Sequence, residues 1–125
     1  MTENELSYVI RGCIFKVYNA LGPGLLESAY EVALKYELLK EELEVQSQVA
    51  LPLIYEDLKI GVGYRLDLIV GQKVIVEVKS VEMIANVHHK QLLTYLKLSG
   101  LKLGLLVNFD TDNIADSIFR KVNRL

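Results

Sequence analysis

The segment from Asp67 to Lys79 sets the strongest constraint on how this chain can fold. It consists of two apolar stretches around a turn that contains Gly71. In the second stretch, valines alternate with residues of mixed character: Val74, Val76 and Val78 alternate with Ile75, Glu77 and Lys79. Because side chains two apart in a strand share a face, we expect the valines to face a core. Glu77 and Lys79 then project together from the opposite face.

The first stretch repeats the alternation and turns the segment into a predicted β-hairpin. Its apolar face consists of Tyr64, Leu66, Leu68 and Val70, and its other face of Arg65, Asp67 and Ile69. A two-residue loop would leave Asp67 and Glu77 on different faces of the sheet. An odd-length loop over residues 71–73 pairs Val70 with Val74 and sets Asp67 opposite Glu77. We therefore predict an odd-length loop or a bulge.

The order of these residues resembles the motif of the PD-(D/E)XK nuclease superfamily. In that order Asp67 comes first, the hairpin turn follows, and Glu77-Val78-Lys79 comes last. Residues 24–30, Gly-Leu-Leu-Glu-Ser-Ala-Tyr, are similar to the GxxExxY signature of one branch of that superfamily. Residues 91–95, Gln-Leu-Leu-Thr-Tyr, resemble the QxxxY motif of its RecB-like exonuclease members. The motifs occur in the expected order and span most of the chain. The sequence departs from the pattern at Leu66, where the superfamily name implies a proline.

The resemblance implies a metal-dependent nuclease that hydrolyses phosphodiester bonds of DNA or RNA. Asp67 and Glu77 would bind Mg²⁺ or Mn²⁺, with Glu27 and the carbonyl of Val78 as further ligands, since such hard cations take oxygen ligands. Lys79 would orient the attacking water or stabilise the transition state. The catalytic set is therefore Glu27, Asp67, Glu77 and Lys79. Exonuclease and endonuclease action are both open.

Four further residues are predicted to contact the substrate: Tyr30, His88, Gln91 and Tyr95. Tyr30 shares a helix face with Glu27, and the other three form a polar stripe along one helix. Each has a simpler explanation. Glu27 would complement a helix dipole, Tyr30 would be a core residue with a solvated hydroxyl, and the stripe would be a solvated face. His89, which points elsewhere, is expected at the surface.

The hydrophobic pattern predicts eight elements that form one domain over residues 1–125. We expect helices over residues 2–21, 25–42, 83–99 and 113–123, and strands over residues 44–55, 59–70, 73–80 and 101–109. Thr2 and Glu5 fit a capping box, and Cys13 lies on the apolar stripe of the first helix. With the resemblance, this order predicts a restriction-endonuclease-like α/β sandwich with a mixed four-stranded sheet flanked by helices.

The charge and composition bear on partners and location. The net charge of −2 argues against tight non-specific binding of nucleic acid by an isolated monomer. A local basic rim, a homodimer or a partner protein would overcome that. A non-catalytic module for binding nucleic acid or protein is therefore the alternative, and a hydrolase of small phosphorylated molecules a third option. The single cysteine and the absence of a secretory signal or membrane-spanning segment favour the cytoplasm.

Overall fold

The computed structural model describes residues 1–125, except for the side chain of Val62. The described residues form three α-helices, five strands and one 3₁₀ turn. In chain order these elements are α1 (Glu3–Leu21), α2 (Glu27–Lys40), β1 (Val45–Tyr55), β2 (Leu58–Val70), β3 (Val74–Lys79), α3 (Asn86–Ser99), β4 (Leu103–Asn108), η1 (Ile114–Ser117) and β5 (Ile118–Val122).

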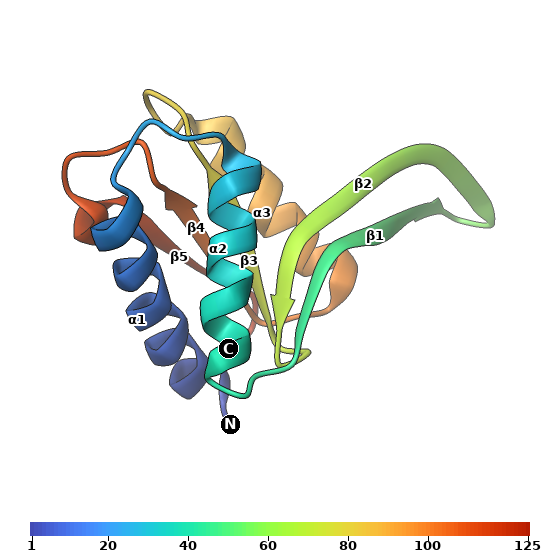
Figure 1. Ribbon diagram of the computed structural model, residues 1–125. Coiled ribbons are helices and arrows are strands. Elements are labelled where there is room, and N and C mark those ends of the chain that lie inside the picture. Colours follow the sequence, from blue (N-terminus) through green and yellow to red (C-terminus); the bar gives the residue numbers. More distant parts are fainter.

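The strands form one mixed sheet in the order β1-β2-β3-β4-β5. The β3–β4 pair is parallel and the other three pairs are antiparallel. Parallel neighbours need a crossover connection, which α3 supplies. Figure 1 shows α1 and α2 on one face of the sheet and α3 on the other. The predicted α/β sandwich with a mixed sheet is confirmed at this level.

The number of strands differs from the prediction, because the sheet has five strands and not four. The predicted helix over residues 113–123 is wrong. The segment makes one 3₁₀ turn, and β5 then pairs with β4, with Phe119 opposite Leu106. Ile114, Ile118 and Val122 are spaced by four, and residues four apart share a face in a strand as well as in a helix. The spacing therefore did not distinguish the two.

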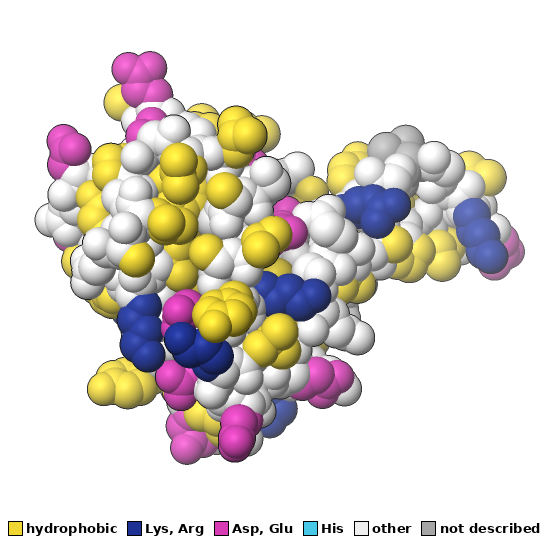
Figure 2. Space-filling model, in the orientation of Figure 1, with side chains coloured by type: hydrophobic (Ala, Val, Ile, Leu, Met, Phe, Trp, Pro, Cys, Tyr) yellow, Lys and Arg dark blue, Asp and Glu magenta, His cyan; other side chains and the backbone are white. Residues whose placement is uncertain are grey.

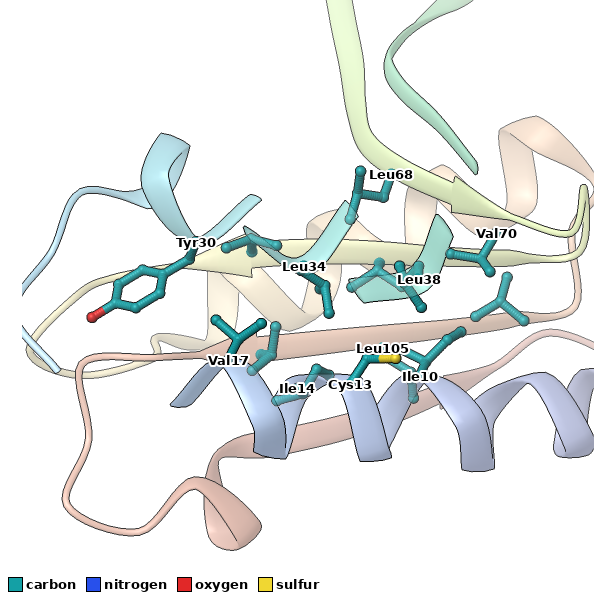
Figure 3. Packing of buried hydrophobic residues seen from close by; sticks show 14 of the residues in the cluster. Ile10, Cys13, Ile14, Val17, Tyr30, Leu34, Leu38, Leu68, Val70 and Leu105 are labelled. Atoms are coloured by element: carbon teal, nitrogen blue, oxygen red, sulfur yellow. The ribbon is translucent and has the colours of Figure 1, made fainter. Parts of the chain in front are cut away.

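Two hydrophobic cores lie on the two faces of the sheet. The core under α1 and α2 includes Ile10, Cys13, Tyr30 and Leu34, which point toward the strands in Figure 3. The smaller core under α3 contains Ile75, Leu92, Tyr95 and Leu106, among others. Cys13 is buried, as predicted. No helix among the described residues has both the length and the apolar character needed to cross a membrane.

The capping box predicted for α1 is present. The Thr2 hydroxyl accepts a hydrogen bond from the Glu5 amide at 3.1 Å, and the Thr2 amide donates to the Glu5 carboxylate at 2.9 Å. These bonds satisfy amides that a helix otherwise leaves free at its first turn. They fix the start of α1, so that its apolar stripe lies against the sheet.

The hairpin of β1 and β2 extends beyond the sheet as an arm (Figure 1). β1 pairs with β2 from Val45 and Val70 to Tyr55 and Leu58. β2 pairs with β3 only as far as Leu68 opposite Val76. Most of β2 therefore has no β3 partner, and the two strands part beside Asp67.

The chain twists sharply at the base of this arm. Leu66 packs into the core under α3, whereas Leu68 packs into the core under α1 and α2. Residues two apart normally share one face, so β2 turns about its own axis at Asp67. In β1, Gln48 has a φ of 52°, which marks the same turn in the partner strand. Asp67 consequently lies at the pivot between the sheet and the arm.

Candidate active site

The turn between β2 and β3 sets the register that brings the two predicted acids together. Val70 pairs with Val74 across residues 71–73, which confirms the three-residue loop. Gly71 and Gln72 have φ values of 59° and 57°, and the Lys73 amide donates to the Val70 carbonyl at 3.1 Å. Continuing this register by three residues places Asp67 opposite Glu77.

The two carboxylates replace the backbone pairing where β2 and β3 part. Asp67 Oδ2 accepts a hydrogen bond from the Val78 amide at 2.8 Å. Glu77 Oε2 lies 3.3 Å from the Asp67 amide and accepts its hydrogen bond. Each acid therefore satisfies an amide of the other strand, so that the strands separate without leaving these donors unpaired. The two residues at which the strands separate, Asp67 and Glu77, are therefore the same two that the sequence predicts as metal ligands.

Glu77 is the more buried of the two acids. Only 6% of its surface is exposed, and its Oε1 has no hydrogen-bond partner among the described residues. Burial, followed by a side-chain hydrogen bond with Asp67 and the negative charge of Asp67, raises the pKa of Glu77 to about 9, although the bond from the Asp67 amide acts in the opposite direction. A carboxyl group with this pKa is protonated at neutral pH. A nearby positive charge would therefore stabilise the ionised form of Glu77 and lower its pKa.

A third acid, Glu31 of α2, lies beside Asp67 and was not predicted from the sequence. Its Oε1 accepts a hydrogen bond from Gln48 Nε2 at 2.8 Å. Burial raises the pKa of Glu31, and the charge of Asp67 raises it further. Glu31 follows Glu27 by four residues and so shares its helix face. That spacing was the signal that could have drawn attention to it.

Glu27 lies near the site but contacts a different group. Its Oε2 accepts a hydrogen bond from the Ser80 amide at 3.2 Å, just beyond the end of β3. The Ser80 hydroxyl also donates to the Leu25 carbonyl at 2.6 Å, which ties the start of α2 to β3. Among the described residues, no three histidine, cysteine or acidic side chains converge closely enough to hold a metal ion. The structure thus joins Asp67 with Glu77 and holds Glu27 to one side.

Lys79 completes the motif on β3. It is half-buried and lies two residues after Glu77 on the same strand. Its charge lowers the pKa of Glu77, against the larger effect of burial. Within the described part of the chain, its ammonium group makes no salt bridge. The positive charge of Lys79 is therefore free to act on a group bound at the carboxylates.

Tyr30 does not fit the predicted contact with substrate. It is fully buried and stacks on Phe109, with ring centroids 4.3 Å apart. Its hydroxyl donates to the Gly22 carbonyl at 2.5 Å and accepts from the Leu25 amide at 3.1 Å. Both bonds hold the loop that joins α1 to α2. The core interpretation therefore describes Tyr30 better, since its hydroxyl fixes the approach of α2 to the sheet.

We predict that Tyr30→Phe destabilises the fold without impairing substrate contact. The variant leaves the partly exposed Gly22 carbonyl and Leu25 amide without this partner, at a cost of about 0.5–1.5 kcal/mol for each lost hydrogen bond. Thermal and urea unfolding measure that loss. Tyr36→Phe is the control, because Tyr36 is exposed on α2. A stable Tyr30→Phe protein with a weakened affinity for nucleic acid would restore the substrate-binding interpretation.

The three predicted residues of α3 lie in different environments. Tyr95 is 7% exposed, and its pKa is raised by burial and then by the charge of Glu77, which places its hydroxyl near the acids. Gln91, one turn earlier, is exposed. His88 Nδ1 accepts a hydrogen bond from the Ala85 amide at 3.0 Å and so caps the start of α3. Tyr95 is therefore within electrostatic reach of Glu77.

His89, which the sequence pattern predicted at the surface, is half-buried. Its ring meets Phe119 of β5 edge-on, with centroids 4.9 Å apart, and its Nδ1 is buried. Burial lowers its pKa, which favours the neutral ring. The predicted surface position is therefore only partly right, because the sequence pattern did not predict β5, and with it Phe119, beside α3. His89 therefore helps to pack the helix onto the edge of the sheet.

Comparison with models of protein families shows which family the chain belongs to. The model of the PD-(D/E)XK nuclease superfamily matches residues 4–122. The chain belongs to the PD-(D/E)XK nuclease superfamily. Comparisons with curated proteins and with solved structures gave no match. The match covers both predicted motif strands and the helices around them, and membership in this superfamily suggests a nuclease.

PD-(D/E)XK nucleases generally use divalent metal ions, so the residues at the pivot must be compared with that requirement. Asp67 and Glu77 offer carboxylate oxygens, which suit a hard divalent cation. Glu77 Oε1 is buried and has no hydrogen-bond partner among the described residues. A buried, unpartnered carboxylate oxygen is costly without a compensating group, and a cation would provide one. The residues therefore fit a divalent ion, with two carboxylates as its core.

Proposed function

We propose that this protein is a nuclease of the GxxExxY branch that hydrolyses phosphodiester bonds of DNA or RNA with Mg²⁺ or Mn²⁺. The observation that carries the proposal is the pairing of Asp67 with Glu77 where β2 and β3 separate. There the buried Glu77 Oε1 lacks a hydrogen-bond partner among the described residues. Residues 1–125 would act as one nuclease-like domain. A homodimer or a partner protein is compatible with this proposal.

The residues divide the chemistry among them. Asp67 and Glu77, with the Val78 carbonyl, would hold the cation, which when bound lowers the pKa of a water molecule and polarises a phosphate oxygen. Lys79 stabilises negative charge that develops on the phosphate in the transition state. Glu27 lies next to Ser80 and would complete the ion's environment through solvent. Gln91, Tyr95 and His88 would contact the substrate from α3.

The alternative is a non-catalytic module that binds nucleic acid or protein on the same fold. The observation in its favour is that the described residues bring no three potential ligands into one metal-binding group. The presence of all three motif residues, Asp67, Glu77 and Lys79, favours the nuclease, because a non-catalytic module does not need them. Metal binding and cleavage together distinguish the two functions.

Millimolar Mg²⁺ or Mn²⁺ is expected to raise the melting temperature of the wild-type protein. A ligand that binds only the folded state stabilises it by RT ln(1 + [L]/Kd), about 2.7 kcal/mol at a hundredfold excess over Kd. Asp67→Asn should remove most of this rise, and differential scanning fluorimetry measures it. The control is Asp57→Asn, because Asp57 is exposed at the turn of the arm.

Cleavage is measured in parallel, with labelled single-stranded and duplex DNA and RNA. The proposal expects cleavage by the wild-type protein that depends on the metal and is lost in Asp67→Asn. If neither ion shifts the melting temperature and no substrate is cut, the non-catalytic module replaces the nuclease.

A further inference from the structure

The exposed face of the arm carries an ordered row of residues that leads to Asp67. Along β1, exposed and covered positions alternate without interruption from residue 45 to residue 54. Ala50 and Ile54, on the exposed face, pair with Arg65 and Lys59 of β2. The two cations therefore share that face, and Asp67 is the next position of the same alternation beyond Arg65.

The space between the two cations is flat. Gly61 and Gly63 lie between them on β2, and a Cβ atom added at either glycine would meet nothing within 4 Å. The pairing of β1 with β2 shifts register beside them, between Leu51 and Leu53. We call the face formed by Lys59, Gly61, Gly63 and Arg65 the arm track. Among the described side chains of β2, this face carries none between its two positive charges.

A third cation lies where the arm joins the body. Lys35 of α2 donates a hydrogen bond to the Ser47 hydroxyl of β1 at 3.0 Å. Figure 2, in which α2 faces the viewer, shows the basic side chains of the arm on that same side of the molecule. The Arg65 guanidinium donates to the Gln48 carbonyl at 3.4 Å, and its other donors have no partner among the described residues. The basic groups therefore follow one side of the molecule from the arm to α2.

The acidic groups lie at the two ends of this row. Glu56 and Asp57 occupy the turn at the tip of the arm, beyond Lys59. At the base, Glu31 is bonded to Gln48, and Asp67 belongs to the candidate metal site. A polyanion on the track would thus meet Lys59 and Arg65 before it meets the site. There a bound cation would offset the charge of Asp67.

We propose that the arm track binds the phosphate backbone of a nucleic acid and guides it toward Asp67 and Glu77. This inference rests on the proposed nuclease function. Lys59 and Arg65 are six positions apart on β2, but the register shift places them opposite Ile54 and Ala50, which are only four positions apart on β1. Four positions correspond to about 13 Å at roughly 3.3 Å per residue. That length is close to the rise of about four nucleotides along one strand of a duplex. The two glycines let the backbone of the ligand approach closely, and the flanking cations pair with its phosphates.

The first test removes the two cations of the track. Lys59→Ala/Arg65→Ala is compared with Lys16→Ala/Lys40→Ala, which removes two positive charges from α1 and α2, where they pair with glutamates. Binding to fluorescent 30-nucleotide DNA and RNA, single-stranded and duplex, is measured by anisotropy over a range of KCl concentrations. The Lys79→Ala background with Mg²⁺ is used, so that the substrate stays intact.

The track variant should bind about tenfold more weakly at low salt, and its slope of log K against log [salt] should fall by about two, one for each phosphate that no longer pairs with a cation. The control should keep the slope of the parent protein. The same variant in the wild-type background should raise KM and leave kcat within about twofold, because the track holds substrate away from the reacting atoms. The substrate whose affinity falls furthest identifies single-stranded or duplex nucleic acid as the ligand.

The second test keeps both cations and fills the track. Gly63→Glu places an acid on the strip, whereas Gly63→Ala adds only a methyl group in open space. We expect Gly63→Glu to weaken binding at least as much as the double alanine variant, and Gly63→Ala to weaken it less, because the methyl group adds bulk to the strip but no negative charge. Circular dichroism melts check that both proteins fold.

The results of these tests distinguish a failure of the arm-track proposal from a failure of the proposed nuclease function. A wild-type protein that cleaves nucleic acid, with track variants that match their controls in affinity and salt slope, overturns the arm track alone. A wild-type protein that neither binds nor cleaves overturns the proposed function.

Discussion

Lys79→Ala is expected to abolish nucleic-acid cleavage while metal binding persists. The lysine follows Glu77 on β3 and makes no salt bridge within the described part of the chain. Its charge acts on the transition state and not on the ion, so its removal should lower kcat by about 10²–10³-fold, as for a removed oxyanion donor. Initial rates on labelled DNA and RNA measure this decrease in activity.

Lys102→Ala is the control for this substitution, because Lys102 is exposed at the opposite end of the sheet, next to the start of β4. The rise in melting temperature with Mn²⁺ should be similar in the wild-type protein and both variants. If Lys79→Ala retains full cleavage, the motif lysine has no catalytic role. If it loses the Mn²⁺ response together with activity, Lys79 acts by supporting the ion site.

The central hairpin could be predicted from sequence because its pattern allows few arrangements. A one-residue slip moves every side chain of a strand to the other face, so the alternation of valines with Glu77 and Lys79 fixes the register. The same pattern predicted an odd-length loop or a bulge, and the pairing of Val70 with Val74 shows that it is the odd-length loop. The pairing of Asp67 with Glu77 therefore followed from local pattern alone.

The residues that surround Asp67 and Glu77 depend on tertiary packing, which a local sequence pattern does not predict. The twist at Asp67, between Leu66 and Leu68, decides which helix residues reach the acids. The sequence motif drew attention to Glu27, yet the twist brings Glu31 beside Asp67. Tyr30 was assigned to substrate because it shares a helix face with Glu27. Its partner Phe109, which follows β4, holds it in the core.

Glu77 should make the metal-free protein less stable as the pH rises. Its pKa of about 9 in the folded state lies above the ordinary value of 4.5, so the folded state retains a proton that the unfolded state releases. The contribution of the protonated Glu77 to the free energy of unfolding is therefore fully present below about pH 4.5 and is lost progressively up to about pH 9. Between pH 5 and pH 8, the decrease should be on the order of 2–4 kcal/mol.

Glu77→Gln should remove this slope, because the amide does not titrate. Urea unfolding at several pH values in EDTA measures the slope, and Glu56→Gln, at the exposed turn of the arm, is the control. The variant should also lose the metal-induced rise in melting temperature. An unchanged slope in Glu77→Gln would assign the pH dependence to other groups.

The same proton links the acid to the metal. An ion that binds the ionised carboxylate must displace the proton, so the affinity for Mn²⁺ should rise as the pH approaches 9, by up to about tenfold per pH unit. Calorimetric titration in two buffers of different ionisation enthalpy counts the protons released. Near pH 7 we expect about one proton per ion for the wild-type protein and for Glu56→Gln. Binding of Mn²⁺ without proton release would mean that the ion does not engage Glu77, and the metal site would then have to be sought at Asp67 and Glu31.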